Sequence, residues 1–288
     1  MILVSTSNGI FQLNPQSGDV NCILQPKQSL GFFGIVEDKV NNITYAASRE
    51  KHGFSWGSKR SSDARLYSID KKTLKIKDVA LLRKVFDVHQ IEIWKDIIFL
   101  SDTSKNRIHT FNLKTKSLSG IINIGKTRKD IHHMNALLVD SNNLLIGLNN
   151  RGYRDSEVLY FPLEKTPLSA GQKVDALQDA RIETITGFQH THDLEKVNGE
   201  IFLCASHQGK LVGIDDLKVH FSLDGFIRGI AGDKNGFWVG NSMRASREER
   251  HNSTLDGEVY LLDSKNFNVI KKYIIPDAGQ VCDLISLS

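Results

Sequence analysis

The chain has 288 residues, of which 40% are hydrophobic and 24% are charged, a composition typical of a soluble globular protein. Its net charge of +4 is too weak to indicate a nucleic-acid-binding protein, and no run approaches the ~20 apolar residues of a membrane-spanning helix. The three cysteines are too few to predict a disulfide framework, and residues 1–13 lack the basic and apolar regions of a signal peptide. We therefore predict one cytoplasmic domain, residues 1–288, that binds neither nucleic acid nor membrane.

Two kinds of segment alternate along the chain after a first short strand at residues 2–5. The first kind reads FFGIVEDKVNNITYAAS, VHQIEIWKDIIFLSD, HHMNALLVDSNNLLIGLNN, THDLEKVNGEIFLCASH, IRGIAGDKNGFWVGNS and, at the end, VCDLISLS. Segments of the second kind begin at Gly9, Arg65, Arg107, Glu157, Lys210 and Glu258. In both kinds, alternating apolar and polar residues flank a turn rich in Asp, Asn, Lys or Gly, which predicts a hairpin. Each pair of hairpins predicts a unit of four strands.

Six such units predict an all-β fold, a six-bladed β-propeller with four-stranded blades. The units recur at intervals comparable with the ~40–50 residues of a typical blade, and radial repetition buries the faces of such sheets. Residues 2–5 align with second strands, so the C-terminal strand, residues 280–287, is expected to complete the first blade and cover its open edge. A β-sandwich, the rival fold, fits poorly with six units in phase.

This architecture resembles the six-bladed propellers of the SMP-30/gluconolactonase, strictosidine-synthase-like and NHL class. The resemblance covers the whole chain and depends on the repeat pattern, because no diagnostic motif of the class is present. The ring of carboxylates and an asparagine that binds metal in SMP-30 proteins is not reproduced at the aligned positions. The calcium chemistry and lactonase activity of that family are therefore not carried over to this chain.

Aligned first-kind segments place one residue per blade at the same level of the central channel. That column contains three histidines among Phe33, His89, His133, His192, Arg228 and Cys282. Two residues further along each strand, a mostly apolar floor is predicted from Ile35, Ile91, Asn135, Leu194, Ile230 and Leu284. Two residues earlier, a more polar rim comprises Gly31, Asp87, Ile131, His190, Phe226 and Gln280. Together the three layers predict a cup that is open on one side and suited to a ligand.

Three neutral imidazoles that converge from neighbouring blades can bind a divalent metal ion such as zinc, iron, manganese or copper. We therefore predict a metal centre formed by His89, His133 and His192. Its imidazoles would be oriented by Gln90, Asp193, Asn135 and Asp87. Two alternatives stay open: a metal-free polar pocket in which the histidines act as acid–base groups, and a purely structural channel.

Three long segments rich in arginine and lysine are predicted on the histidine face, at residues 49–64, 149–156 and 241–257. With Arg228 inside the cup, they predict a small anionic or carboxylate-bearing substrate, or a peptide. The predicted substrate-binding residues are Arg228, Cys282, Asp87, Asn135, Gln280, Arg151 and Arg244. The predicted catalytic residues are His190, His207 and Asp193.

The resulting functional hypothesis is a metal-dependent enzyme of the hydrolase or lyase type, or an oxidative enzyme if the metal is iron or copper. No G-x-S-x-G elbow, P-loop, dinucleotide-binding motif or H-E-x-x-H sequence selects a particular reaction. The alternative hypothesis is a non-catalytic propeller that binds a peptide or protein partner on its basic loop face.

Overall fold

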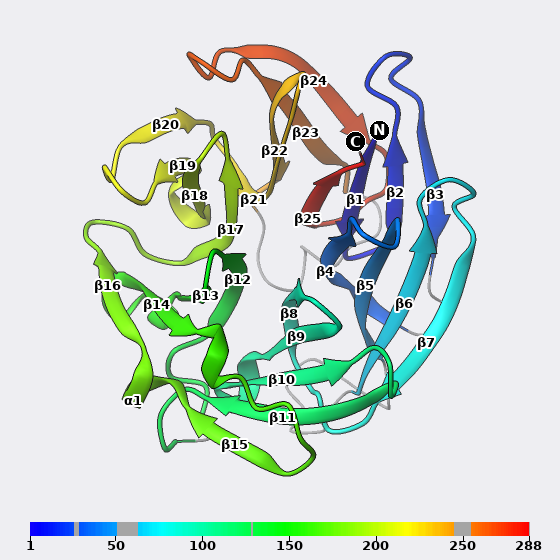
Figure 1. Ribbon diagram of the computed structural model, residues 1–288. Helices are drawn as coiled ribbons and strands as arrows, with labels where there is room; N and C mark the ends of the chain where they lie inside the picture. Colours follow the sequence, from blue (N-terminus) through cyan, green and yellow to red (C-terminus); the bar gives the residue numbers. More distant parts are fainter. Residues whose placement is uncertain (26–28, 51–62, 128, 245–254, 288) are drawn as a thin grey trace.

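The protein folds as a β-propeller, in which six sheets are arranged in a ring around a central axis (Figure 1). This computed structural model describes residues 1–25, 29–50, 63–127, 129–244 and 255–287. Each sheet contains four strands in hairpin order, and the third carries a fifth strand that pairs parallel to its outer edge. The predicted fold class and number of blades are confirmed.

The blades follow one another around the ring in chain order. The first contains β1 (Ile2–Thr6), β2 (Ile10–Leu13), β3 (Val20–Leu24) and β25 (Val281–Ser286). The second contains β4 (Ser29–Asp38), β5 (Ile43–Glu50), β6 (Ala64–Asp70) and β7 (Ile76–Leu82). The third contains β8 (Val88–Trp94), β9 (Ile97–Asp102), β10 (Arg107–Asn112), β11 (Ser117–Asn123) and β15 (Gln172–Asp175).

The remaining three blades each have four strands. The fourth contains β12 (Met134–Asp140), β13 (Asn143–Leu148), β14 (Ser156–Pro162) and β16 (Arg181–Ile185). The fifth contains β17 (Thr191–Val197), β18 (Glu200–Ala205), β19 (Lys210–Gly213) and β20 (Val219–Ser222), and the sixth contains β21 (Phe226–Asp233), β22 (Gly236–Ser242), β23 (Gly257–Leu262) and β24 (Val269–Ile275). Short helices in the connections are η1 (Thr103–Lys105), η2 (Asn150–Gly152), η3 (Leu163–Lys165), α1 (Ala176–Asp179) and η4 (Ser206–Gln208). In the described part of the chain, no helix is long and apolar enough to cross a bilayer.

The two ends of the chain close the ring within one sheet. Strand β25 pairs antiparallel with β1, so that Val4 lies opposite Leu284 and Ile2 opposite Ser286, and the two termini lie side by side (Figure 1). The C-terminal strand thereby covers the inner edge of β1, which would otherwise expose unpaired backbone groups. This is the predicted completion of the first blade.

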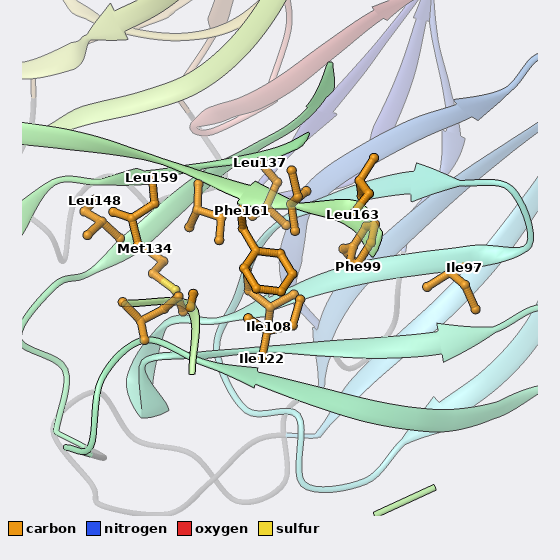
Figure 2. Packing of buried hydrophobic residues seen from close by; sticks show 14 residues of the cluster. Ile97, Phe99, Ile108, Ile122, Met134, Leu137, Leu148, Leu159, Phe161 and Leu163 are labelled. Carbon is orange, nitrogen blue, oxygen red and sulfur yellow. The ribbon is translucent and has the colours of Figure 1, made fainter. Parts of the chain in front are cut away.

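The hydrophobic cores lie between neighbouring blades rather than at the centre of the ring. Figure 2 shows one of them, in which Phe99, Ile108 and Ile122 of the third blade pack against Met134 and Phe161 of the fourth. Strand alternation directs every second side chain toward the adjacent blade, so the six-fold repetition buries both faces of most sheets. The channel is therefore left for residues that the cores do not use.

Three pairs of neighbouring blades are linked near the channel. In each pair, a side-chain oxygen of one blade accepts a hydrogen bond from a backbone N–H of the next. Asp283 of β25 accepts from Ile35 N at 3.0 Å, Gln90 of β8 accepts from Leu137 N at 2.8 Å, and Asp193 of β17 accepts from Ile230 N at 2.7 Å. We call these three contacts the interblade bridges. They connect blade one to two, three to four and five to six.

Small residues allow the other blades to approach closely. A Cβ atom on Gly34 would lie 2.6 Å from Ile91 N of the third blade, and one on Gly229 would lie 2.7 Å from Leu284 Cγ of the first. Such distances are far below van der Waals contact, so glycine is required at both positions.

The bridges also correct the predicted floor of the cup. Leu137 N occupies in the fourth blade the position that Ile35 N and Ile230 N occupy in the second and sixth. A cavity of about 290 Å³ in the lower channel is accordingly lined by Leu137 together with Ile35, Ile91, Leu194 and Leu284. The floor residue is thus Leu137 and not Asn135, and the alignment of the fourth blade was wrong by two residues. Asn135 lies one layer higher, at a bulge in β12.

Candidate functional site

The candidate site is the half of the channel at which the inner strands β4, β8, β12, β17, β21 and β25 begin. Each of these strands has an irregularity of pairing at this level, at or beside Phe33, His89, Asn135, Asp193, Arg228 and Cys282. A bulge breaks strict alternation and redirects side chains. In a regular strand, only every second side chain would face this region. The bulges bring additional polar and charged side chains into it. We call this region the upper channel.

Aromatic rings in the upper channel form two arcs. In the first, the ring centroids of Phe33 and His89 are 6.0 Å apart, and those of His89 and His133 are 5.2 Å apart. In the second, His192 lies 5.5 Å from Phe226, which lies 5.2 Å from His207. Of the three predicted histidines, His89 and His133 are thus adjacent in one arc, and His192 belongs to the other.

Each arc carries one buried arginine. Arg49 is 6% exposed, and its guanidinium carbon lies 3.7 Å from the centre of the Phe33 ring. It donates to Val88 O at 2.8 Å and forms an ion pair with Asp87 at 2.8 Å. Arg228 is 7% exposed, lies over the Phe226 ring at 5.0 Å and donates a hydrogen bond to His192 Nε2. Two buried guanidinium groups make this half of the channel attractive to anions.

Burial, together with nearby positive charges, keeps the imidazoles of His89 and His192 neutral. Burial, reinforced by Arg49, His133, Arg228 and His192, holds the pKa of His89 well below its usual value of 6.5. Burial and the charge of Arg228 hold the pKa of His192 well below that value too. Because His192 Nδ1 lies 3.0 Å from the carbonyl oxygen of His190, this nitrogen carries the proton and Nε2 is left to accept from Arg228.

His133 is held by a carboxylate that the repeat pattern does not predict. Its backbone has a φ of 49°, and its Nδ1 lies 2.9 Å from Asp130 Oδ2, which also pairs with Arg151 Nη1 at 3.0 Å. A carboxylate on Nδ1 favours the tautomer whose Nε2 bears the lone pair. Asp130 stands three residues before His133, and this spacing was the only signal in the sequence. Arg49 was predicted only as the first residue of a loop.

The predicted catalytic residues lie in two different places. The rings of His190 and His207 stack 4.3 Å apart at the rim, where His207 is exposed. Gly152 makes room for His190, because a Cβ there would lie 2.0 Å from Nε2. Asp193 is buried below the rim, and its carboxylate accepts from Gln90 Nε2 at 2.6 Å and from Leu194 N at 3.0 Å, in addition to its interblade bridge.

Three of the predicted substrate-binding residues are buried in the walls of the channel. The side-chain oxygen and nitrogen of Asn135, and the amide nitrogen of Gln280, are buried and form no hydrogen bond with described residues. Burial raises the pKa of the Cys282 thiol to about 11, so this cysteine is a poor nucleophile at neutral pH. Asn135 and Gln280 therefore offer polar atoms to a bound molecule, and Cys282 offers a neutral thiol.

Arg244 is separate from these residues. Its side chain is about half exposed, pairs with Asp224 at 3.3 Å and donates to Gly225 O at 3.2 Å. The central parts of two of the basic segments, residues 51–62 and 245–254, lie outside the described residues. The third segment, residues 149–156, includes η2 and brings Arg151 to Asp130.

The side chains do not form a ready three-ligand centre. Among the described residues, no three His, Cys, Asp or Glu side chains are placed so that they could hold one metal ion. In addition, the Nε2 lone pair of His192 is engaged by Arg228. A metal ion held by all three histidines would require His192 to release that contact.

The lower channel has a different chemical character. Besides the floor residues, its cavity is lined by four residues with carboxyl groups and by two lysines: Glu37, Glu92, Glu195, Asp283, Lys39 and Lys196. Burial raises the pKa of Glu92 to about 7, and burial together with the charges of Asp193 and Glu92 raises that of Glu195 well above its usual value. Buried arginines and histidines thus lie on one side of the apolar floor, and buried carboxyl groups on the other.

Comparison with known proteins establishes the class of fold. A chain from a nidogen/laminin complex superposes with a TM-score of 0.68 at 9% identity, covering 99% of this chain and 97% of that one. A Bacteroides uniformis protein named "putative 6-phosphogluconolactonase" gives a TM-score of 0.55 at 15% identity, covering 96% and 82%. A Bacteroides caccae protein of unknown function gives 0.60 at 13% identity, covering 99% and 97%. No protein-family model matches the chain, and no curated protein matches it in sequence. At these identities the likeness defines a β-propeller and nothing finer.

Proposed function

We propose that the upper channel is the active site of a hydrolase that acts on a small anionic substrate. The observation that carries this proposal is the pair of buried arginines, Arg49 and Arg228, among imidazoles that stay neutral. A buried guanidinium holds a carboxylate or phosphate by charge-assisted hydrogen bonds, and a neutral imidazole accepts a proton. Neighbours named as 6-phosphogluconolactonases offer a substrate class to test, the esters and lactones of phosphorylated or carboxylated sugars.

His133 is our proposed general base. Asp130 holds its Nδ1 proton, as the carboxylate of a catalytic triad does, and leaves the lone pair on Nε2 of a ring that lies 5.2 Å from that of His89. In ester hydrolysis, Nε2 takes a proton from water while the water oxygen forms a bond to the carbonyl carbon. The C–O bond to the leaving group then breaks, and the imidazolium returns the proton to the departing oxygen. We assign the base to His133 and not to Asp193, whose oxygens are occupied by three hydrogen bonds.

A metal-dependent form of this function is the second candidate. His89, His133 and His192 would hold a divalent ion, which would supply Lewis-acid activation of water or of a carbonyl group. The low pKa values of His89 and His192 favour it, because a ligating imidazole must be neutral. Elemental analysis of untagged wild type and His133→Ala tests it: stoichiometric metal that is lost in the variant supports the centre, and no tight binding of added zinc, iron, manganese or copper contradicts it.

The hydrolase proposal is tested with a panel of phosphorylated and carboxylated esters and lactones. We expect Arg228→Gln to raise KM about 10- to 100-fold through the lost charge-assisted contact. His133→Ala and Asp130→Asn should instead lower kcat, by about 100-fold or more, because they remove or misorient the base. Arg181→Gln is the matched control, since Arg181 lies on an exposed outer strand and pairs with Glu183.

Two results would count against the hydrolase. The first is the absence of hydrolysis across the panel by folded wild type. The second is a turnover that does not change in Arg228→Gln and His133→Ala while their thermal unfolding stays like that of wild type. Binding of a peptide without turnover would instead favour the alternative, a non-catalytic propeller.

A further inference from the structure

A second basic site lies away from the channel, in a groove on the third blade. The groove has a volume of about 510 Å³, which is within the range of small-molecule sites. It is bordered by the connection between β7 and β8, by β10 and β11, and by the start of β15. Among the described sheets, only that of the third blade has a fifth strand, and Gly120 of β11 lies opposite Gln172 of β15.

The lining of this groove is strongly basic. It contains Arg83, Lys84, Lys105, Arg107 and Lys173 and no carboxylate. Arg107 is paired with the buried Asp102 at 3.0 Å. For the other four cations, no carboxylate of the described residues lies within ion-pair distance. Four basic residues that line one groove, without a carboxylate of the described residues at ion-pair distance, favour a ligand with several negative charges.

The floor of the groove is apolar and contains one aromatic ring. Phe86, Leu118 and Ile121 line it, and the centre of the Phe86 ring lies 5.5 Å from Lys105 Nζ and 5.9 Å from the guanidinium carbon of Arg107. His109, which is 4% exposed, also lines the groove, and its Nε2 forms no hydrogen bond with described residues, the Asp102 carboxylate being 3.5 Å away. A wholly polar anion would leave this apolar floor without a contact.

We propose that the groove binds a nucleoside polyphosphate, with the phosphates among the lysines and arginines and the base on the apolar floor. Lysine and arginine are suited to phosphate oxygens, and a planar base covers aromatic and aliphatic side chains without requiring specific hydrogen bonds. The lysine contributed by β15 makes the fifth strand part of the site. The proposal does not depend on the function of the upper channel.

Calorimetric titration with three probes tests each half of the ligand. We expect ATP to bind, inorganic tripolyphosphate to bind about 10-fold more weakly because it lacks the base, and adenosine not to bind measurably. Phe86→Leu should weaken the binding of ATP and leave the affinity for tripolyphosphate unchanged. Arg228→Gln, in the channel, should leave the affinity for ATP unchanged.

Charge-reversal variants distinguish specific binding in the groove from non-specific attraction of an anion to a basic protein. Lys105→Glu combined with Lys173→Glu should reduce ATP affinity at least about 10-fold, since each change replaces attraction by repulsion. Lys116→Glu combined with Lys234→Glu changes the net charge equally at exposed positions outside the groove and should have no effect. The proposal is overturned if both pairs weaken ATP alike, if tripolyphosphate binds as tightly as ATP, or if a single-stranded oligonucleotide binds more tightly than ATP.

Discussion

Burial shifts the pKa values of single residues in the channel. It lowers those of histidines and raises those of carboxyl groups, so the two kinds of residue change stability with pH in opposite directions. His89 and His192 have lowered pKa values, so the folded state binds their protons less readily than the unfolded chain does. Their contribution to the free energy of unfolding is complete above about pH 6.5 and is lost as the pH falls below that value. The carboxyls of Glu92 and Asp193 have raised pKa values, about 7 and about 6, and act in the opposite direction.

Glu92 gives a prediction for pH dependence. The folded-state pKa of Glu92 is about 7, above the usual 4.5. Its contribution to the free energy of unfolding is therefore complete below about pH 4.5 and is lost as the pH rises through 7. We expect Glu92→Gln to be about 1 to 3 kcal/mol more stable than wild type at pH 8 and equally stable at pH 4. Urea unfolding at the two pH values measures this. Glu164→Gln, on the exposed surface of η3, should change neither value, and a Glu92→Gln variant without a gain at pH 8 would contradict the prediction.

At the scale of the strands, the interblade bridges position the elements that form the site. Asp193 follows His192 in β17, and Asp283 follows Cys282 in β25, so a residue that lines the upper channel is adjacent to one that holds the next blade. The bulge separates these two tasks by turning neighbouring side chains in different directions. Small residues complete the arrangement, since Gly34 and Gly229 admit the backbone of the blade that follows.

Asp283 provides the test at this scale. Its carboxylate accepts from Ile35 N at 3.0 Å and from Leu284 N at 2.8 Å, and both amides are buried. Asp283→Ala leaves two buried donors unsatisfied, and we expect it to lower the free energy of unfolding by about 2 to 4 kcal/mol. Asp283→Asn retains an acceptor oxygen and should lose clearly less. Equal stability of the alanine variant and wild type, measured by urea denaturation, would rule out a stabilising bridge.

For the whole molecule, closure of the ring depends on the last strand. Val281 and Leu284 of β25 are buried in the core that β1 shares with the sixth blade, and β25 covers the edge of β1. We expect deletion of residues 281–288 to abolish cooperative thermal unfolding, because it exposes both this core and a strand edge. A synthetic peptide of residues 279–288, added in trans, should restore the transition. A truncated protein that unfolds cooperatively at the wild-type temperature would show that closure is dispensable.

Much of the fold could be predicted from the sequence, because alternation of apolar residues and turn composition are local signals. They recur six times, so the number of blades does not depend on the exact alignment of any one unit. The candidate site was predicted less completely. The predicted column aligned His133 with Phe33 and Arg228, whereas the pairing irregularities make Asn135 their counterpart in the fourth blade, so that blade was shifted by two residues. The shift arose because β12 begins at Met134, after a residue with positive φ, and the periodicity of a strand does not report a bulge.

The number of blades and their closure by the C-terminal strand follow from the order of residues alone, because both depend on local alternation and turn composition. Which side chains meet near the axis depends on the folded arrangement of the blades. Asp130 reaches His133, Arg49 stacks on Phe33, and Arg228 occupies the nitrogen of His192. Each of these contacts depends on bulges, left-handed backbone positions or packing between blades. Such features arise from pairing with another strand, and the alternation of apolar and polar residues in the sequence does not reveal them.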